Sequence, residues 1–212
     1  MKEDSLMNSF KTIKENKKAQ IVEKKSKFIA NIIAVESQKE AEDMISKIKK
    51  EYYDAKHNCF AYIVYGENKE IIKRFSDDGE PSGTAGAPIL EILEKQNLCN
   101  VLVVVTRYFG GILLGTGGLV RAYSEATLKA LDNTEHVTKI IGFEVSIEVD
   151  YKKLKDLKYF LEKENIKIID TKYLENVEIT AEIPENKLSL ILENVKKNII
   201  KQQIKTKKYI EI

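Results

Sequence analysis

The stretch from residue 77 to residue 86 gathers side-chain oxygens on a chain that glycines allow to bend sharply. Its three carboxylates belong to Asp77, Asp78 and Glu80, and its two hydroxyls belong to Ser82 and Thr84. Hard cations such as Mg²⁺ bind oxygen ligands of this kind, although metal-binding loops fix ligand spacing more tightly. The same acids can instead cap the following helix and orient the turn. The stretch therefore predicts a structural or binding-surface role, with a metal site as the alternative.

A second group of residues follows a run of β-branched residues and leucine. Arg107 and Tyr108 stand at the end of this run, immediately before Phe109, Gly110 and Gly111. Strand ends in α/β folds are where ligands collect, and the planar guanidinium suits a carboxylate or a phosphate. An equally good partner for Arg107 is one of the acids of residues 77–86, in which case the arginine holds that loop in place.

A glycine-rich turn continues this segment up to residue 118. Gly115, Gly117 and Gly118 precede a helical pattern that contains Arg121, and backbone N–H groups at such a turn can converge on an anion. The spacing matches neither a Walker A loop nor a dinucleotide fingerprint, because Thr116 replaces the required lysine and Val120 the third glycine. The alternative is that the glycines permit close packing of a helix on a strand.

Two further features complete the candidate chemistry. His57 and Cys59 are two residues apart on a predicted strand and so share a face, but no third residue that would orient a nucleophile can be identified. The C-terminal segment is rich in lysine, including Lys201, Lys205, Lys207 and Lys208. These lysines could contact the phosphates of a nucleic acid, or they could form a solvated face on an edge strand.

The first half of the chain reads as an α+β domain. Alternating and apolar residues predict a pair of strands or one bent strand over residues 18–35, and Ser37 with Glu40 forms a capping-box pattern before a helix that extends to about Glu51. A hairpin over residues 57–75 turns at residues 66–68. Further along, the pattern predicts a helix over 88–94, a strand buried on both faces over 101–105, and a helix over 119–131.

The second half predicts a ferredoxin-like domain. Its pattern is strand 140–149, helix 151–164, strands 166–172 and 176–183, helix 186–197 and strand 202–212, which is the order β-α-β-β-α-β. We therefore expect an α+β protein of two domains, with residues 1–135 in the first and residues 136–212 in the second.

Composition narrows the class of protein. The 212 residues are 43% hydrophobic and 32% charged with a formal net charge of +2, so any binding to an anionic partner must come from a local patch. The two cysteines, Cys59 and Cys99, can form neither a disulfide framework nor a zinc ribbon, and a reducing compartment suits them. No stretch resembles a signal peptide or a membrane helix. We expect a cytoplasmic protein that is neither secreted nor membrane-spanning.

Three blocks of sequence resemble the signature of the YigZ/IMPACT family. They are residues 55–62 (AKHNCFAY), 76–90 (SDDGEPSGTAGAPIL) and 105–123 (VTRYFGGILLGTGGLVRAY), and they occur in the family's order. The resemblance implies that the first domain is similar in fold to domain IV of elongation factor G. It implies that the second resembles domain V of that factor, as in bacterial members of the family.

The resemblance also implies a link to translation. Eukaryotic members restrain a starvation-responsive kinase with the help of an additional RWD domain, for which the roughly seventeen residues before the first predicted strand leave no room. We therefore expect a translation-associated binding protein or regulator that contacts RNA, the ribosome or another protein through the glycine and arginine turn and the C-terminal lysines. The alternative is an enzyme that uses Asp77, Asp78 and Glu80 to hold a metal beside a phosphate. The family supplies no catalytic residue, cofactor or metal ligand to carry over.

Overall fold

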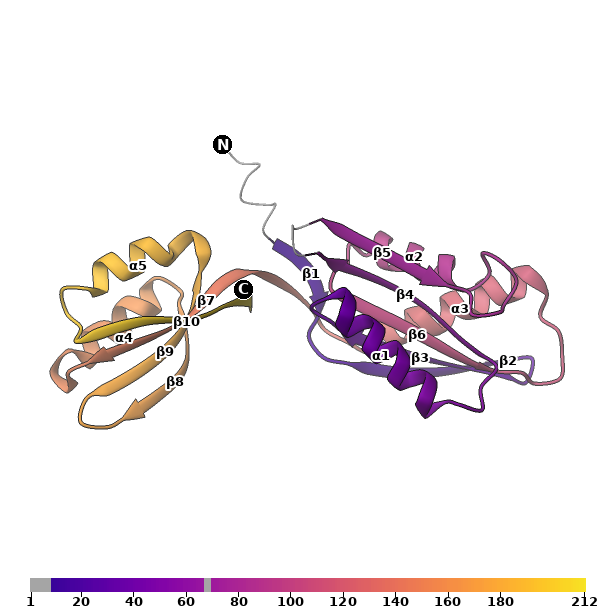
Figure 1. Cartoon of the computed structure of the whole chain (residues 1–212), viewed down its shortest axis with the longest axis horizontal. Coiled ribbons are helices and arrows are strands. Elements are labelled where there is room, and N and C mark those ends of the chain that lie inside the picture. The colour runs from indigo at the N-terminus through magenta and orange to yellow at the C-terminus, as the bar shows by residue number, and fades with distance from the viewer. Residues whose placement is uncertain (1–8, 67–69) are drawn as a thin grey trace. The chain divides into compact units, whose positions relative to one another are not determined.

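The computed structural model describes residues 9–66 and 70–212 of the chain. Its elements follow in the order β1, β2, β3, α1, β4, β5, α2, β6, α3 and then β7, α4, β8, β9, α5, β10, with a short 3₁₀ turn before each of α4 and α5. Figure 1 shows this path. The predicted α+β class is confirmed, since both halves combine antiparallel sheets with helices.

The first sheet has five antiparallel strands in the order β2-β3-β6-β4-β5. The strands are β2 (Lys17–Glu23), β3 (Ser26–Ala34), β4 (His57–Tyr65), β5 (Ile71–Ser76) and β6 (Val101–Tyr108). The central strand β6 is buried from Val101 through Arg107, as its unbroken apolar run predicts. Residues 18–35 therefore form a pair of strands. The predicted turn at residues 66–68 lies partly outside the described residues, which resume at Glu70.

Helices cover both faces of this sheet. Helix α1 (Gln38–Glu51) packs on β4 and β6, whereas α2 (Gly86–Lys95) packs on β4 and β5 and α3 (Gly115–Leu131) on β2 and β3. Figure 1 shows α1 on one face and α2 and α3 on the other. The predicted cap of α1 is confirmed, because the Glu40 backbone N–H donates to Ser37 Oγ at 3.1 Å. The Glu40 carboxylate accepts from the backbone of Glu36 at 2.7 Å rather than from that of Ser37.

In the N-terminal unit, β1 is an element that the sequence did not predict, and α2 and α3 begin earlier than predicted. Strand β1 (Ser9–Ile13) precedes the first predicted strand, and the N–H of Cys99 holds it by donating to the carbonyl of Lys11 at 2.8 Å. Helix α2 begins at Gly86 rather than at Pro88, because the carboxylate of Asp77 accepts the N–H groups of Ala85 and Gly86. Helix α3 begins at Gly115 rather than at residue 119, since glycines permit the helical turn as readily as a loop.

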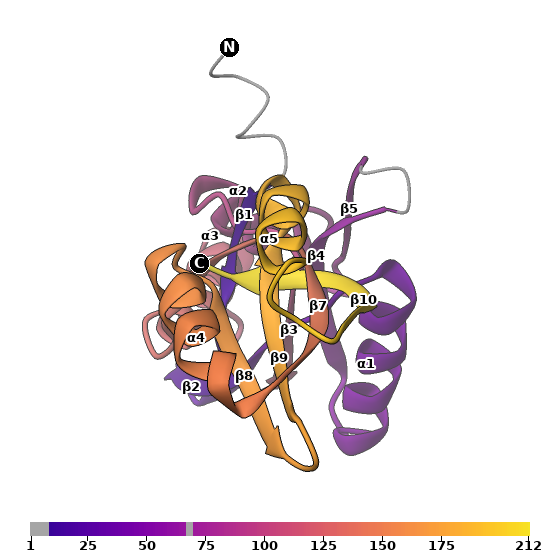
Figure 2. The ribbon, with the colours of Figure 1, turned by 90° about the vertical axis from the view of Figure 1, so that its left-hand side faces the viewer.

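The second sheet contains strands in the order β10-β7-β9-β8, all antiparallel. The strands are β7 (His136–Val149), β8 (Lys167–Tyr173), β9 (Val177–Pro184) and β10 (Lys201–Glu211). Helices α4 (Leu154–Lys163) and α5 (Leu188–Val195) cover one face, where Val145, Ile147 and Ile179 form the core with Leu161 and Ile191 (Figure 2). The predicted ferredoxin-like order is confirmed.

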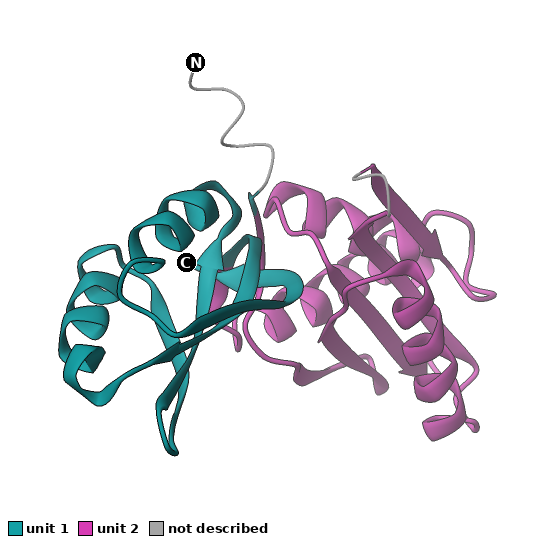
Figure 3. Cartoon of the chain, turned by 60° about the vertical axis from the view of Figure 1, so that its left-hand side comes forward, with its two compact units in different colours: residues 1–9, 138–212 teal, residues 10–137 magenta. Residues whose placement is uncertain are grey.

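The chain divides into two compact units, coloured separately in Figure 3. Among the described residues, the N-terminal unit is Phe10–Val137, and the C-terminal unit comprises Ser9 and Thr138–Ile212. The division after Val137 lies close to the boundary expected after residue 135. No helix in residues 9–66 and 70–212 combines the length and apolar character needed to cross a membrane.

Candidate functional site

Arg107 lies near one end of the first sheet, in register with residues of both neighbouring strands. It is paired with Phe28 on β3 and with His57 on β4. Its guanidinium lies between two rings, with the carbon Cζ 5.4 Å from the ring centre of Phe28 and 5.6 Å from that of Phe109. Only 6% of the residue is exposed. Arg107 is therefore a buried cation, and such a cation needs a charged partner.

That partner is Glu80. The Arg107 Nη1 group donates to Glu80 Oε1 at 2.7 Å, and the same oxygen accepts from the Tyr123 hydroxyl at 2.8 Å. The Cys59 thiol donates in turn to the Tyr123 hydroxyl at 3.3 Å. Burial raises the pKa of Tyr123, so its hydroxyl keeps the proton that it donates. Of the two partners that the sequence allows for Arg107, a ligand or an acid of residues 77–86, the structure shows the acid.

Asp77 caps helix α2 from outside the helix. Its Oδ1 accepts the N–H groups of Ala85 at 3.0 Å and Gly86 at 2.8 Å, and its Oδ2 accepts that of Gly83 at 2.8 Å. A carboxylate at this position satisfies donors that the helix leaves unpaired and interacts favourably with the helix dipole. This is the capping role that the sequence allowed, achieved across eight and nine residues of chain.

Asp78 is used internally as well. Its Oδ1 accepts from Lys49 Nζ at 2.6 Å and its Oδ2 from the backbone N–H of Asn58 at 2.7 Å. Together with Glu80 and Asp77, it directs its charge into the protein. Within residues 9–66 and 70–212, no three His, Cys, Asp or Glu side chains are placed to hold a metal.

The remaining predicted site residues Ser82, Thr84 and Tyr108 lie in different environments. Thr84 is buried and its hydroxyl donates to the carbonyl of Pro81 at 2.7 Å, whereas Ser82 is exposed. Tyr108 turns to the other face of the sheet, where its hydroxyl donates to Asp54 at 2.7 Å. That hydrogen bond raises the pKa of Tyr108 to about 12. Tyr108 is therefore not gathered with Arg107, although the two are neighbours in sequence.

The predicted glycine turn has two structural roles. Gly111 and Gly115 have backbone φ values of 84° and 70°, a conformation that residues other than glycine rarely adopt. A Cβ atom on Gly110 would lie 2.0 Å from the backbone carbon of Lys25, so only glycine fits against the β2–β3 turn. Gly117 and Gly118 lie in the first turn of α3, and a Cβ on Gly117 would meet nothing within 4 Å.

A pocket of about 420 Å³ opens beside these residues, and we call it the signature pocket. Its lining is largely apolar around a few polar groups, which is the usual make-up of a ligand pocket. The residues that line it are Lys56, His57, Glu80, Pro81, Arg107, Phe109, Leu113, Leu114, Gly115, Thr116 and Leu119. Two predicted site residues, Glu80 and Arg107, thus form part of its wall, and Gly115 lies at its edge with the start of α3.

The polar groups of the signature pocket differ in what they can offer. The His57 Nδ1 atom lies 2.9 Å from the carbonyl oxygen of Asp78, which can only accept, so Nδ1 carries the proton. In the tautomer that carries its one proton on Nδ1, Nε2 is the acceptor of the ring. The Nε atom of Arg107 is buried with no hydrogen-bond partner among the described residues. Lys56 is exposed and takes part in none of the ion pairs of residues 9–66 and 70–212.

Apolar side chains stand exposed on the loop that contributes Phe109 and Leu113 to the signature pocket. Phe109, Ile112 and Leu113 are 53%, 43% and 83% exposed, respectively. The loop that carries them is held by Ser26, whose Oγ accepts the N–H of Gly110 at 3.1 Å. Exposed apolar residues gathered beside a pocket mark a surface for binding rather than for solvation.

Cations surround this end of the N-terminal unit. Lys24 and Lys25 form the exposed β2–β3 turn that contacts Gly110, and Arg121 is exposed on α3. In the described part of the chain, no ion pair involves Lys24, Lys25 or Arg121. We call the surface made by Lys24, Lys25, Lys56 and the rim of the signature pocket the signature end. Of the acids of residues 77–86, Glu80 lines the signature pocket but is paired with Arg107, Asp78 is paired with Lys49, and Asp77 accepts backbone N–H groups. None of them pairs with these cations.

Three of the C-terminal lysines, for which the sequence allows either phosphate contacts or a solvated face, are paired with carboxylates. Lys205 pairs with Glu178 at 3.1 Å and Lys207 with Glu185 at 2.6 Å. Lys208 pairs with both Glu144 and Glu182, each at 2.9 Å, and these contacts raise the pKa of Lys208. Of these carboxylates, Glu144 lies on β7, the strand paired with β10, whereas Glu178 and Glu182 lie on β9 and Glu185 directly follows β9. Lys201 is exposed and stands opposite Glu148 on β7.

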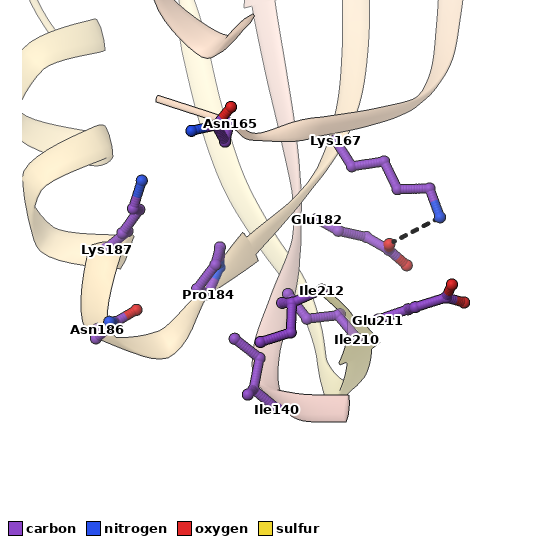
Figure 4. Close-up of a pocket in the computed structure, with 10 residues that line it drawn as sticks. All are labelled: Ile140, Asn165, Lys167, Glu182, Pro184, Asn186, Lys187, Ile210, Glu211 and Ile212. Atoms are coloured by element: carbon purple, nitrogen blue, oxygen red, sulfur yellow. Dashed lines mark ion pairs between the residues drawn. The ribbon is translucent and has the colours of Figure 1, made fainter. Parts of the chain in front are cut away.

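A second pocket, of about 360 Å³, lies within the C-terminal unit and is drawn in Figure 4. It lies where β10, the end of β9 and the start of β8 meet, with Ile140, Ile210 and Ile212 on its apolar side. Its lysines are engaged: Lys167 pairs with Glu182 at 3.8 Å, and Lys187 pairs with Glu164 at 3.6 Å. This pocket therefore presents less free charge than the signature pocket.

The cysteines give a test of how closed the N-terminal unit is. Burial raises the pKa of Cys59 to about 12 and that of Cys99 to about 11, from an ordinary value of 9.0. Folding keeps both thiols protonated, so folded stability falls as the pH rises above 9 and the unfolded thiols ionise. Near pH 9 we expect both thiols to react slowly with Ellman's reagent in the native protein and quickly in urea. Fast reaction of either thiol without denaturant would contradict this burial.

Sequence reasoning missed several residues of the site. Lys56, Phe109 and Leu113 received no role, although apolar side chains within a glycine-rich stretch are a signal of an exposed binding loop. Tyr123 was one residue among many in the third block, and its contact with Glu80 spans 43 positions. Cys59 and His57 share a face as predicted, but the Cys59 Sγ atom also lies 2.9 Å from the Asp77 carbonyl oxygen, so its single proton has two acceptors within reach, this oxygen and the Tyr123 hydroxyl.

Comparisons with known proteins agree with the architecture. The Impact N-terminal domain matches residues 24–131, and a domain of unknown function designated DUF1949 matches residues 147–193. A crystal structure described as that of a hypothetical protein superposes with a TM-score of 0.64 and 30% identity, covering 90% of this chain and 92% of that one.

Two bacterial relatives match along most of their length. The IMPACT family member YigZ of Escherichia coli is 34% identical over 166 residues, which cover 78% of this chain and 81% of that protein. The IMPACT family member YvyE of Bacillus subtilis is 40% identical over 188 residues, or 89% of this chain and 86% of that protein. The resemblance in the three signature blocks is thereby confirmed, and this chain belongs to the IMPACT family.

Proposed function

We propose that this chain is a cytosolic, translation-associated protein that binds RNA through the signature end of its N-terminal unit. The proposed link to translation is supported by membership of the IMPACT family, for which the resemblance implies a role in translation. The proposed position of the RNA-binding surface is supported by the difference between unpaired and paired lysines. Lys24, Lys25 and Lys56 have no carboxylate partner among the described residues, whereas Lys205, Lys207 and Lys208 do.

That contrast in pairing is the observation that carries the proposal. A lysine bound to a carboxylate must give up that ion pair to contact a phosphate, so its net contribution to RNA binding is small. An unpaired lysine gives up only hydration and releases counterions from the RNA, which favours binding. The exposed ring of Phe109 beside these lysines adds a surface on which an unpaired base can stack.

Two triple variants with the same loss of charge test the placement. In the first, Lys24, Lys25 and Lys56 are each replaced by glutamine, and in the second Lys205, Lys207 and Lys208 are. Binding of a fluorescein-labelled single-stranded RNA is followed by anisotropy over a range of salt concentrations. We expect the first variant to bind about tenfold or more weakly and to lower the salt slope by about 2, since each phosphate contact contributes about 0.7.

The second variant should bind within about threefold of the unaltered protein, because its lysines are already paired. The reverse ranking of the two variants would overturn the placement on the N-terminal unit. Absence of RNA binding by the unaltered protein, or binding that does not respond to salt, would remove the proposal itself.

A further inference from the structure

We infer that the signature pocket takes a single nucleotide, with its base against the apolar wall and its phosphate at the start of α3 beside Lys56. This inference rests on the proposed RNA binding and deepens it, because it adds a pocket for one nucleotide of the RNA to the contacts with phosphates. The pocket volume of about 420 Å³ is in the range of small-ligand pockets, at roughly 300–1,000 Å³.

The anion end of the pocket is formed by the first turn of α3. This helix has 17 residues, and its N-cap residue Leu114 makes no side-chain hydrogen bond to the free N–H groups. Gly115 and Thr116 line the pocket at this point. N–H groups left unpaired at the start of a long helix, together with the helix dipole, favour a phosphate. The exposed ammonium group of Lys56 supplies a full positive charge at the same pocket.

Arg107 contributes hydrogen-bond donors to the wall of the pocket, where its charge is paired with that of Glu80. The residue lines the pocket with only 6% of its surface exposed, and its Nε–H has no partner among the described residues. Its Nη2 makes only a long contact of 3.5 Å, to Ser26 Oγ. Because Nη2 carries two N–H groups and makes this one long contact, it keeps hydrogen-bonding capacity for a ligand at this wall.

The apolar wall suits a planar base. One side of the Phe109 ring covers the guanidinium of Arg107, yet half of the residue remains exposed at the pocket. Leu113, Leu114 and Leu119 complete the wall. RNA-binding proteins read unpaired bases by stacking them on aromatic rings and by hydrogen bonds to their edges. The Nε2 atom of His57 is available to accept such a bond, since Nδ1 is engaged with the carbonyl of Asp78.

The test uses free nucleotides, inorganic phosphate and RNA on the whole chain. Calorimetry with each of the four ribonucleoside monophosphates measures the pocket directly, and inorganic phosphate measures the anion end alone. We expect at least one nucleotide to bind more tightly than phosphate. We expect Phe109→Ala to weaken nucleotide binding about tenfold, as loss of a stacking partner does, without changing phosphate binding.

Matched variants separate the pocket from general effects. Phe75→Ala removes another half-exposed phenylalanine of the same unit, and Lys47→Gln removes an exposed lysine on α1 as a control for Lys56→Gln. Circular dichroism establishes that each variant folds. Nucleotide binding that Phe109→Ala and Lys56→Gln leave unchanged would overturn the inference, as would binding of an acidic peptide at the pocket with no binding of any nucleotide.

RNA binding provides the arm that distinguishes this inference from the proposed function. An RNA strand with abasic positions retains its phosphates but has no bases to stack. If Phe109→Ala weakens binding of normal RNA but not of abasic RNA, the pocket holds a base of the strand. If normal and abasic RNA bind equally well and both respond to salt, the phosphate-binding function stands and the nucleotide pocket is wrong.

Discussion

Glu80→Gln is expected to destabilise the N-terminal unit by about 3–5 kcal/mol, because it leaves the buried guanidinium of Arg107 without a charged partner. The side chains of Arg107 and Glu80 are only 7% and 3% exposed, and arginine cannot lose its proton to escape the cost. The glutamine keeps the shape of the side chain, so the loss reports on charge rather than on a cavity. Hydrogen exchange of a peptide from β6 measures the effect, with a peptide from β9 as the internal reference.

An exposed ion pair of the same unit serves as the control. Lys73 and Glu94 are 2.7 Å apart, as close as Arg107 and Glu80, but their side chains are 46% and 41% exposed. Glu94→Gln should therefore change stability by less than about 1 kcal/mol. Equal losses in Glu80→Gln and Glu94→Gln would show that burial does not decide the strength of the pair. A double variant, Glu80→Leu with Arg107→Met, should recover part of the loss, since it leaves no unpaired charge.

Gly110→Ala is the second change with a large expected effect. The added Cβ would lie 2.0 Å from the carbonyl carbon of Lys25 and 2.2 Å from its oxygen. Both contacts are with backbone, so the loop or the β2–β3 turn must move, and the hydrogen bond from Gly110 to Ser26 is weakened. We expect a loss of about 3 kcal/mol, at the upper end of the usual cost of overpacking. Urea unfolding followed by circular dichroism measures it.

Gly117→Ala is the matched substitution in the same glycine-rich segment. Its Cβ would meet nothing within 4 Å, and the residue is helical, so alanine should stabilise α3 by up to about 1 kcal/mol. The two glycines are seven positions apart and read alike in the sequence. Opposite signs of the two effects would establish that one glycine permits close packing and the other does not. A loss of stability in Gly117→Ala similar to that in Gly110→Ala would contradict the structure of the turn.

Much of the fold could be predicted because its signals are local. Ser37 caps α1 through a donor three residues away, and the unbroken apolar run at 101–105 marks the central strand. The ferredoxin-like order follows from alternating and helical periods in residues 136–212. The predicted start of α2 was wrong because Asp77, nine residues before Gly86, accepts the N–H of Gly86 and lets the helix begin there. The predicted start of α3 was wrong because the glycines before residue 119 are compatible with either a loop or a helix.

The candidate site was less predictable, because residue types do not say which way a charge faces. Asp77, Asp78 and Glu80 could equally have bound a metal. They face inward because the register of β4 and β6 places Arg107, the backbone of Asn58 and the start of α2 within reach of the loop. In the same way, the lysines of β10 could have been free, but three of them pair with carboxylates on β7, on β9 and on the 3₁₀ turn that follows β9.

The sequence by itself determined the family, the two-domain α+β architecture and the segment that carries the candidate site, because motif order and hydrophobic period are properties of neighbouring residues. Only the tertiary structure decided which charges remain for a ligand. Arg107 and Glu80 are 27 positions apart, and Tyr123 and Glu80 are 43 apart, so their pairing depends on how strands and helices pack. That packing pairs the acids of the signature and leaves Lys56 at the signature pocket, and Lys24 and Lys25 on the neighbouring β2–β3 turn, without a carboxylate partner among the described residues.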